Sequence, residues 1–150
     1  MTENQFVVFK LGQEKYGVDI LNVGTISEYL DITKVPDAPY YVEGMINLRG
    51  DIIPVINLKK RFNMAESEIS DETRIIIYSI DGIDIGFLVD EASQVLRVDE
   101  KDIEPTPAIL RGQEREYISG VGKYENHIII LLDFSKVLNE AERAEITKLV

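Results

Sequence analysis

The chain has 150 residues, the length of one ordinary domain or of two very small modules that share a core. Its 27 acidic and 16 basic residues give a net charge of −11, which argues against binding to the phosphates of nucleic acids. It contains no cysteine and one histidine, His127, so the sequence excludes disulfides, thiol catalysis, and metal sites built from cysteine or several histidines.

The first strands are predicted close to the N-terminus. Runs rich in β-branched and aromatic residues predict strands at Phe6–Leu11 and Lys15–Ile20, and the Gly12-Gln13-Glu14 segment between them predicts a hairpin turn. The next segment, Ile20–Ser27, fits either a helical turn or a strand.

A second hairpin is predicted after a proline-bounded loop at residues 36–39. Its strands are Met45–Leu48 and Ile52–Leu58, and its turn is Arg49-Gly50-Asp51. Pro54 lies within the returning strand, where it removes one ladder donor. We therefore expect an edge strand or a β-bulge there.

The second half of the chain predicts two more hairpins. Arg74–Ile80 and Ile83–Val89 flank an Asp-Gly turn, and Ile118–Lys123 and His127–Asp133 flank a Glu-Asn turn. The continuous apolar runs in these strands are typical of strands that are covered on both faces. The intervening segment, Asp99–Leu110, is polar and contains proline, so we expect a loop with one helical turn.

Short helices are predicted at two places. Lys59-Lys60-Arg61 is interpreted as the solvated last turn of a short helix, where positive charge is favourable, rather than as a binding patch. Asn139, with Glu142 three residues later, matches an N-cap signature and predicts a C-terminal helix over 139–150.

The sequence contains an internal repeat. Tyr41–Leu58 aligns without a gap with Tyr117–Phe134, at an offset of 76 residues, and Phe6–Leu11 aligns with Ile75–Ile80 at an offset of 69. Two copies of a module of roughly seventy residues indicate a duplicated small domain rather than a solenoid.

The predicted fold is mostly β, with two small barrels, short helices and a C-terminal helix. Closed barrels are expected because closure removes exposed sheet edges. We expect a single domain over 1–150, with a first barrel at 16–70 and a second at 71–138. The N-terminal strand is free to exchange between them.

The second hairpin also carries a family signature. Gly44-Met-Ile-Asn-Leu-Arg-Gly50, followed by Ile52-Ile-Pro-Val55 and Asn57-Leu58, closely resembles the signature of CheW-type chemotaxis coupling proteins. That signature reads Gly, Val-Ile-Asn-Leu-Arg-Gly, Ile-Ile-Pro-Val and Asp- or Asn-Leu. The resemblance extends over nearly the whole chain. It implies two five-stranded SH3-like barrels that pack about a pseudo-two-fold axis.

The resemblance implies a non-enzymatic adaptor that needs no cofactor or metal. Its expected partners are the regulatory domain of the histidine kinase CheA and the cytoplasmic tip of methyl-accepting chemoreceptors, which it would couple in bacterial chemotaxis signalling. The sequence shows no signal peptide and no apolar run of about twenty residues. We therefore expect a cytoplasmic protein that associates with receptor arrays at the inner face of the membrane, without inserting into it.

The resemblance also implies a receptor-binding groove between the two barrels. The residues that it assigns to this groove are Gly44, Asn47, Leu48, Arg49 and Gly50, with Val23 and Val89 as less distinctive matches. Many relatives have a glutamate where this chain has Thr25, which puts a carboxylate contact there in question. The residues that contact the kinase are not assigned.

Two of these positions can also be interpreted from the repeat. Arg49 has Glu125 as its counterpart, and the reversed charge indicates that the two halves do different jobs at that corner. An exposed turn arginine is the simpler interpretation of Arg49 alone, but the motif favours a guanidinium that pairs with carboxylates on a partner helix. Gly44 and Gly120 coincide, which indicates a backbone role.

Two alternative functions stay open. One is a CheW-like module of a larger scaffold, such as a CheV-type fusion or the kinase itself, although the sequence shows no receiver or kinase motif. The other is a small acidic hydrolase. No serine lies in a Gly-x-Ser-x-Gly elbow, which leaves only a carboxylate pair as a candidate catalytic site.

Overall fold

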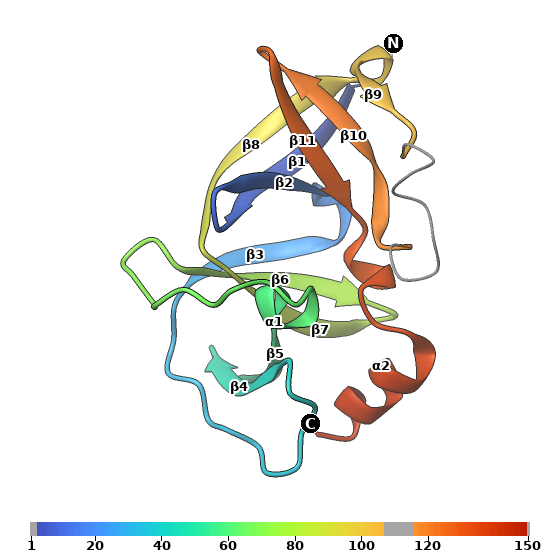
Figure 1. The fold of residues 1–150 in the computed structure, drawn as a ribbon. Helices are drawn as coiled ribbons and strands as arrows, with labels where there is room; N and C mark the ends of the chain where they lie inside the picture. The colour runs from blue at the N-terminus through green and yellow to red at the C-terminus, as the bar shows by residue number, and fades with distance from the viewer. Residues whose placement is uncertain (1–2, 107–115, 150) are drawn as a thin grey trace.

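The structure is a computed structural model that describes residues 3–106 and 116–149. It contains two β-sheets that pack against each other, with the C-terminal helix α2 beside the second sheet (Figure 1). Sheet A has the strand order β8-β1-β2-β11-β10-β9 and sheet B the order β3-β6-β7-β5-β4. The mostly β fold with few helices that the sequence predicted is therefore confirmed.

The strands of sheet A are β1 (Glu3–Leu11), β2 (Glu14–Asp19), β8 (Glu91–Asp99), β9 (Ile103–Glu104), β10 (Ile118–Tyr124) and β11 (His127–Leu132). Those of sheet B are β3 (Val23–Glu28), β4 (Val42–Leu48), β5 (Asp51–Asn57), β6 (Arg74–Ile80) and β7 (Ile83–Val89). The helical segments are η1 (Ile20–Asn22), α1 (Leu58–Arg61), η2 (Glu100–Asp102), η5 (Phe134–Lys136) and α2 (Glu140–Thr147).

All four predicted hairpins are present. In three of them both turn residues have a positive φ, as the type I′ turns favoured by twisted hairpins require: Arg49-Gly50, Asp81-Gly82 and Glu125-Asn126. The ambiguous segment after β2 contains both predicted alternatives, η1 followed by β3. Of the predicted loop at 99–110, residues 99–106 contain η2 and β9, and the rest lies outside the described residues.

The sheets do not divide the chain at residue 70, as the expected halves 16–70 and 71–138 do. The β6–β7 hairpin of the second copy lies in sheet B, where Ile76 pairs with Ile26 and Phe87 with Ile56. In return, the β1–β2 hairpin of the first copy pairs with β8 and β11 in sheet A. Each sheet therefore combines one whole hairpin from one copy with the remaining strands of the other.

The hydrogen-bonded ladders stay open, contrary to the expected closed barrels. The chain itself connects the two edges of each sheet. In sheet A, η2 leads directly from the edge strand β8 into β9 at the opposite edge. In sheet B, Thr33 follows β3 and exchanges two backbone hydrogen bonds of 2.8 Å with Met45 in β4. Because β9 is short and separate, sheet A has six strands rather than the expected five.

The edge-strand prediction for Pro54 is wrong, because β5 lies between β4 and β7. The parallel pairing of β5 with β7 begins at Val55, one residue after the proline. Its partner in β4, Met45, directs its own N–H and carbonyl to Thr33, so the missing N–H of Pro54 removes no hydrogen bond from the β4–β5 ladder.

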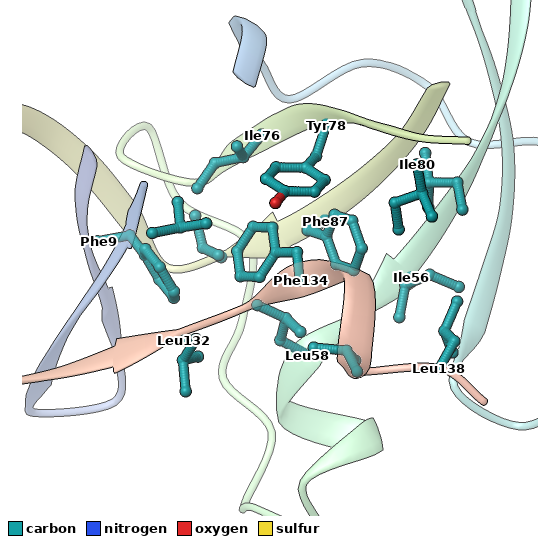
Figure 2. Packing of buried hydrophobic residues seen from close by; sticks show 14 of the residues in the cluster. Phe9, Ile56, Leu58, Ile76, Tyr78, Ile80, Phe87, Leu132, Phe134 and Leu138 are labelled. Carbon is teal, nitrogen blue, oxygen red and sulfur yellow. The ribbon is translucent and has the colours of Figure 1, made fainter. Parts of the chain in front are cut away.

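Three hydrophobic clusters hold the fold together. Each sheet encloses one cluster, and the largest lies between the sheets (Figure 2). At its centre, the ring of Phe134 stacks on Phe87 with a centroid distance of 4.3 Å and meets the edge of Tyr78 at 5.3 Å. Since Phe134 follows β11 and the other two rings come from β6 and β7, these contacts join the sheets.

Alternate residues of one strand serve different clusters, as the period of two in a β-strand requires. In β6, Ile75 and Ile77 fill the cluster inside sheet B, whereas Ile76 and Tyr78 face the cluster between the sheets. The prediction that these apolar runs are covered on both faces is thus confirmed for β6. In β11, Ile128 is an exception, with 68% of its surface exposed.

The predicted C-terminal helix is confirmed as α2. Asn139 accepts the N–H of Glu142 at 2.8 Å, and the Glu142 carboxylate accepts the N–H of Asn139 at 2.9 Å, which completes the predicted capping box. Ile146 anchors the helix in the cluster between the sheets. Arg143 reaches Asp81 in the β6–β7 turn at 3.1 Å.

Candidate partner-binding surface

Arg49 is the first residue of the two-residue turn between β4 and β5 and is exposed. Its φ is 53° and that of Gly50 is 93°, so both residues are left-handed. The backbone N–H of Gly50 donates a hydrogen bond of 2.9 Å to the side-chain oxygen of Asn47. The Asn-Leu-Arg-Gly sequence therefore builds the turn that holds the arginine at the end of the hairpin.

The guanidinium of Arg49 makes no ion pair within the described residues, although the protein is strongly acidic. Its repeat counterpart, Glu125, takes the same place in the β10–β11 turn, with a φ of 47° and an exposed side chain. The two hairpins therefore present opposite charges on similar backbones. A planar guanidinium with free donors can bind a carboxylate through two parallel hydrogen bonds.

Gly44 is buried in β4 and has a backbone role, as the repeat predicted. With a φ of 145°, it lies at a bulge in the β4–β5 ladder, and an added Cβ would come within 2.1 Å of the carbonyl oxygen of Thr33. Gly120 forms the same bulge in β10, where a Cβ would lie 2.9 Å from the carbonyl oxygen of Glu104. Gly44 therefore supports the hairpin and offers no side chain to a partner.

Val23 and Val89, the two less distinctive predicted residues, do not belong to the hairpin of Arg49. Val23 begins β3, is half-buried and packs against the cluster between the sheets, while Thr25 in the same strand is exposed. Val89 is 1% exposed and belongs to that cluster, so its side chain has no surface for a partner to contact. In sheet B, β3 and β4 are the two edge strands, and the bridge between Thr33 and Met45 connects these edges. The structure thus groups Asn47 to Gly50 at one hairpin end, without Val23 or Val89.

An apolar residue beside this turn was missed by the sequence reasoning. Ile52 pairs with Asn47 across the ladder and is 53% exposed, whereas Leu48 packs partly against the cluster inside sheet B. Ile128, the repeat counterpart of Ile52, is also exposed. Alternation along a strand predicts that one of Ile52 and Ile53 is exposed and the other buried. Two adjacent isoleucines do not show which of the two is exposed.

The basic run at 59–61 forms α1, as predicted, but it is not fully solvated. Lys59 is only 6% exposed, and its ammonium lies 3.0 Å from the carboxylate of Asp90. The other two cations pair with Glu43 and Glu142, at 2.9 Å and 3.3 Å. Because each cation already has an acidic partner, this run does not form a free basic patch.

Two features that the described residues lack bear on the type of site. Within residues 3–106 and 116–149, no group of three or more His, Asp or Glu side chains could hold a metal ion. No helix in the same residues has the length and apolar character that crossing a bilayer requires. The candidate site is the exposed hairpin end formed by Asn47, Leu48, Arg49, Gly50 and Ile52, which we call the Arg49 turn.

Comparisons with known proteins match nearly the whole chain. The model of the CheW-like domain family matches residues 5–142. The chain is 37% identical to a chemotaxis protein CheW of Treponema pallidum, over 97% of this chain and 88% of that protein. It is also 37% identical to a chemotaxis protein CheW of Bacillus subtilis, over 93% and 89% of the two chains.

A solved structure agrees with these sequence matches. The crystal structure of the scaffolding protein TtCheW from Thermoanaerobacter tengcongensis superposes with a TM-score of 0.83 and 39% identity, covering 91% of this chain and 92% of that one. This similarity supports SH3-like sheets. Because the named CheW relatives are matched over nearly their full length, the comparisons favour the CheW interpretation over the CheV-type alternative.

Proposed function

Because this chain belongs to the CheW family, we propose that it is a non-enzymatic adaptor that couples chemoreceptors to the histidine kinase CheA. Its proposed partners are the cytoplasmic tip of a methyl-accepting chemoreceptor and the regulatory domain of the kinase. The proposed location is the receptor array at the inner face of the membrane. The proposal builds on the family of the chain and on the geometry of the Arg49 turn.

The observation that carries the receptor-binding proposal is the exposed guanidinium of Arg49, which has no ion-pair partner among the described residues and lies on a turn that Asn47 rigidifies. A receptor helix that carries carboxylates would pair with the guanidinium, and its apolar side chains would cover Ile52. Since the turn is already formed, little conformational entropy is lost on binding.

The kinase is proposed to dock a barrel of the same type against the outer face of the sheet that carries the Arg49 turn. We expect each contact to be modest, with about 8 kcal/mol corresponding to micromolar affinity. The strength of the assembly would then come from many linked contacts in an array.

A charge exchange between the two hairpins tests the receptor proposal. Arg49→Glu introduces a glutamate at the first position of the turn. The equivalent position of the β10–β11 turn already holds a glutamate, Glu125, with a positive φ, so the fold should be retained. We expect this variant to lose most of its co-precipitation with a receptor-tip fragment. Glu125→Arg is the matched control and should bind the fragment normally. Unchanged binding by Arg49→Glu would refute the assignment of the Arg49 turn.

A further inference from the structure

A cavity of about 420 Å³ opens where the two sheets meet, on a face that does not include the Arg49 turn. Phe6 and Leu131 form part of its apolar lining, together with the ring of Tyr78. Leu21 stands beside it with 85% of its surface exposed. The cavity thus has an apolar wall and an unusually exposed leucine next to it.

Two carboxylates, from Asp19 and Asp133, line the same cavity. Each uses one oxygen to cap a helical turn: Asp19 accepts the N–H of Leu21 at 2.9 Å, and Asp133 accepts the N–H of Ser135 at 3.0 Å and its hydroxyl at 2.5 Å. The second oxygen of each has no hydrogen-bond partner within the described residues, and neither carboxylate is in an ion pair there. Among the described residues that line the cavity there is no lysine or arginine.

The charges of Asp19 and Asp133 both affect the phenol of Tyr78. Burial raises the pKa of Tyr78, a hydrogen bond from the Asn22 amide opposes this rise, and the negative charges of Asp133 and Asp19 add to it. The two carboxylates therefore contribute negative potential at one place, next to the apolar wall.

The other copy of the repeat has a longer, cationic side chain at the position of Ser135. The counterpart of Ser135 is Lys59, whose stem is buried and whose ammonium is held by Asp90 and by the hydroxyl of Ser67. The counterpart of Asp133 is Asn57, which caps α1 through the N–H of Lys60. In the first copy a buried lysine of the chain itself thus stands where the second copy has the short Ser135.

We propose that this cavity binds a lysine or arginine side chain that a partner protein presents next to an apolar residue. The alkyl stem would lie along Phe6 and Leu131, and the cationic end would reach the free oxygens of Asp19 and Asp133. The neighbouring apolar residue would cover Leu21. This site is independent of the proposed receptor contact, because it selects a cation whereas Arg49 selects an anion.

The test is a titration of the uniformly ¹⁵N-labelled protein, followed by NMR, with the capped dipeptide acetyl-Leu-Arg-amide. Acetyl-Leu-Gln-amide is the neutral probe of similar size. We expect the arginine probe to shift the amide signals of Leu21, Asn22 and Ser135, and to bind about twofold to fivefold more tightly than the glutamine probe, as a partly exposed ion pair predicts. Equal binding of the two probes, or shifts confined to other regions, would overturn the proposal.

Three variants sharpen the test. Asp133→Asn should keep the cap, because Asn57 caps α1 in the same way. It should nevertheless weaken the binding of the arginine probe, by the factor that separates the arginine and glutamine probes on the native protein. Asp99→Asn is its matched control, since Asp99 also caps a helical turn but does not line the cavity, and it should leave binding unchanged. Ser135→Lys should fill the cavity as Lys59 fills its counterpart and abolish binding. Full binding by a folded Ser135→Lys variant would contradict the proposed location.

Discussion

Asp90 accepts the ammonium of Lys59 at 3.0 Å while the same carboxylate oxygen accepts the backbone N–H of Gly12 at 2.7 Å. Lys59 belongs to α1, which follows sheet B, and Gly12 lies in the turn between β1 and β2 of sheet A. One carboxylate therefore ties together elements of both sheets. It is an electrostatic link across the join, in addition to the aromatic cluster.

Removing this carboxylate should destabilise the fold. Asp90→Ala leaves the ammonium of Lys59 nearly buried, with the hydroxyl of Ser67 as its one remaining partner among the described residues. We expect a loss of about 2–3 kcal/mol in the free energy of unfolding, at or below the lower limit of about 3 kcal/mol for a broken buried pair, because Asp90 is partly exposed. Urea unfolding of the native protein and of the variant measures this loss. The double variant Lys59→Met with Asp90→Ala should recover part of the loss, and no recovery would contradict the explanation.

The two bulge glycines should tolerate a methyl group unequally. Gly44→Ala brings a Cβ within 2.1 Å of a backbone oxygen at a φ of 145°, so we expect it to cost about 3 kcal/mol or more. Gly120→Ala, with a closest contact of 2.9 Å, should cost less. Gly24→Ala is the control, because its nearest contact of 3.8 Å is ordinary. Thermal unfolding of the three variants gives the order, and equal losses would count against the bulge geometry.

Phe134 should be among the most important residues for stability. Its ring is fully buried and contacts Phe9, Tyr78 and Phe87, which come from both sheets. We expect Phe134→Ala to cost about 3–5 kcal/mol, the usual range for deleting a buried phenylalanine. Ile128→Ala, at a 68% exposed position, should change the free energy of unfolding by less than about 0.5 kcal/mol. Similar losses in both variants would contradict the described core.

Alkaline pH should weaken the attachment of α2. The hydroxyl of Tyr41 donates to Glu142 at 3.1 Å, and burial, followed by the charge of Glu142, raises the pKa of Tyr41 well above its usual value. Above about pH 10 the unfolded tyrosine loses its proton while the folded one keeps it, so stability falls as the pH rises. Tyr41→Phe should show a shallower decline in urea unfolding between pH 8 and 11. Identical slopes would exclude this role.

Local structure could be predicted from the sequence because the signals are local. The type I′ turns carry glycine or asparagine at their second position, and Asn139 with Glu142 specifies the start of α2. The repeat offset of 76 residues matches the structure in detail, since Gly44 and Gly120 form equivalent bulges.

The long-range arrangement could not be predicted in the same way. The apolar run of β6 has the same pattern whether its hairpin pairs within its own copy or with β3 and β5 of the other. For the same reason the sequence did not show that Val89 is buried. The part of the candidate site that could be predicted is Asn47 to Gly50, because the motif residues themselves form this turn. Ile52 was missed because its exposure depends on which face of β5 turns outward.

The most direct test of the adaptor account is a calorimetric titration of this protein with a chemoreceptor cytoplasmic-tip fragment, comparing the native sequence, Arg49→Glu and Glu125→Arg. The account predicts micromolar binding by the native protein and by Glu125→Arg, and a loss of about tenfold or more for Arg49→Glu, corresponding to at least about 1.4 kcal/mol. Equal affinities of all three proteins, or a loss confined to Glu125→Arg, would contradict it.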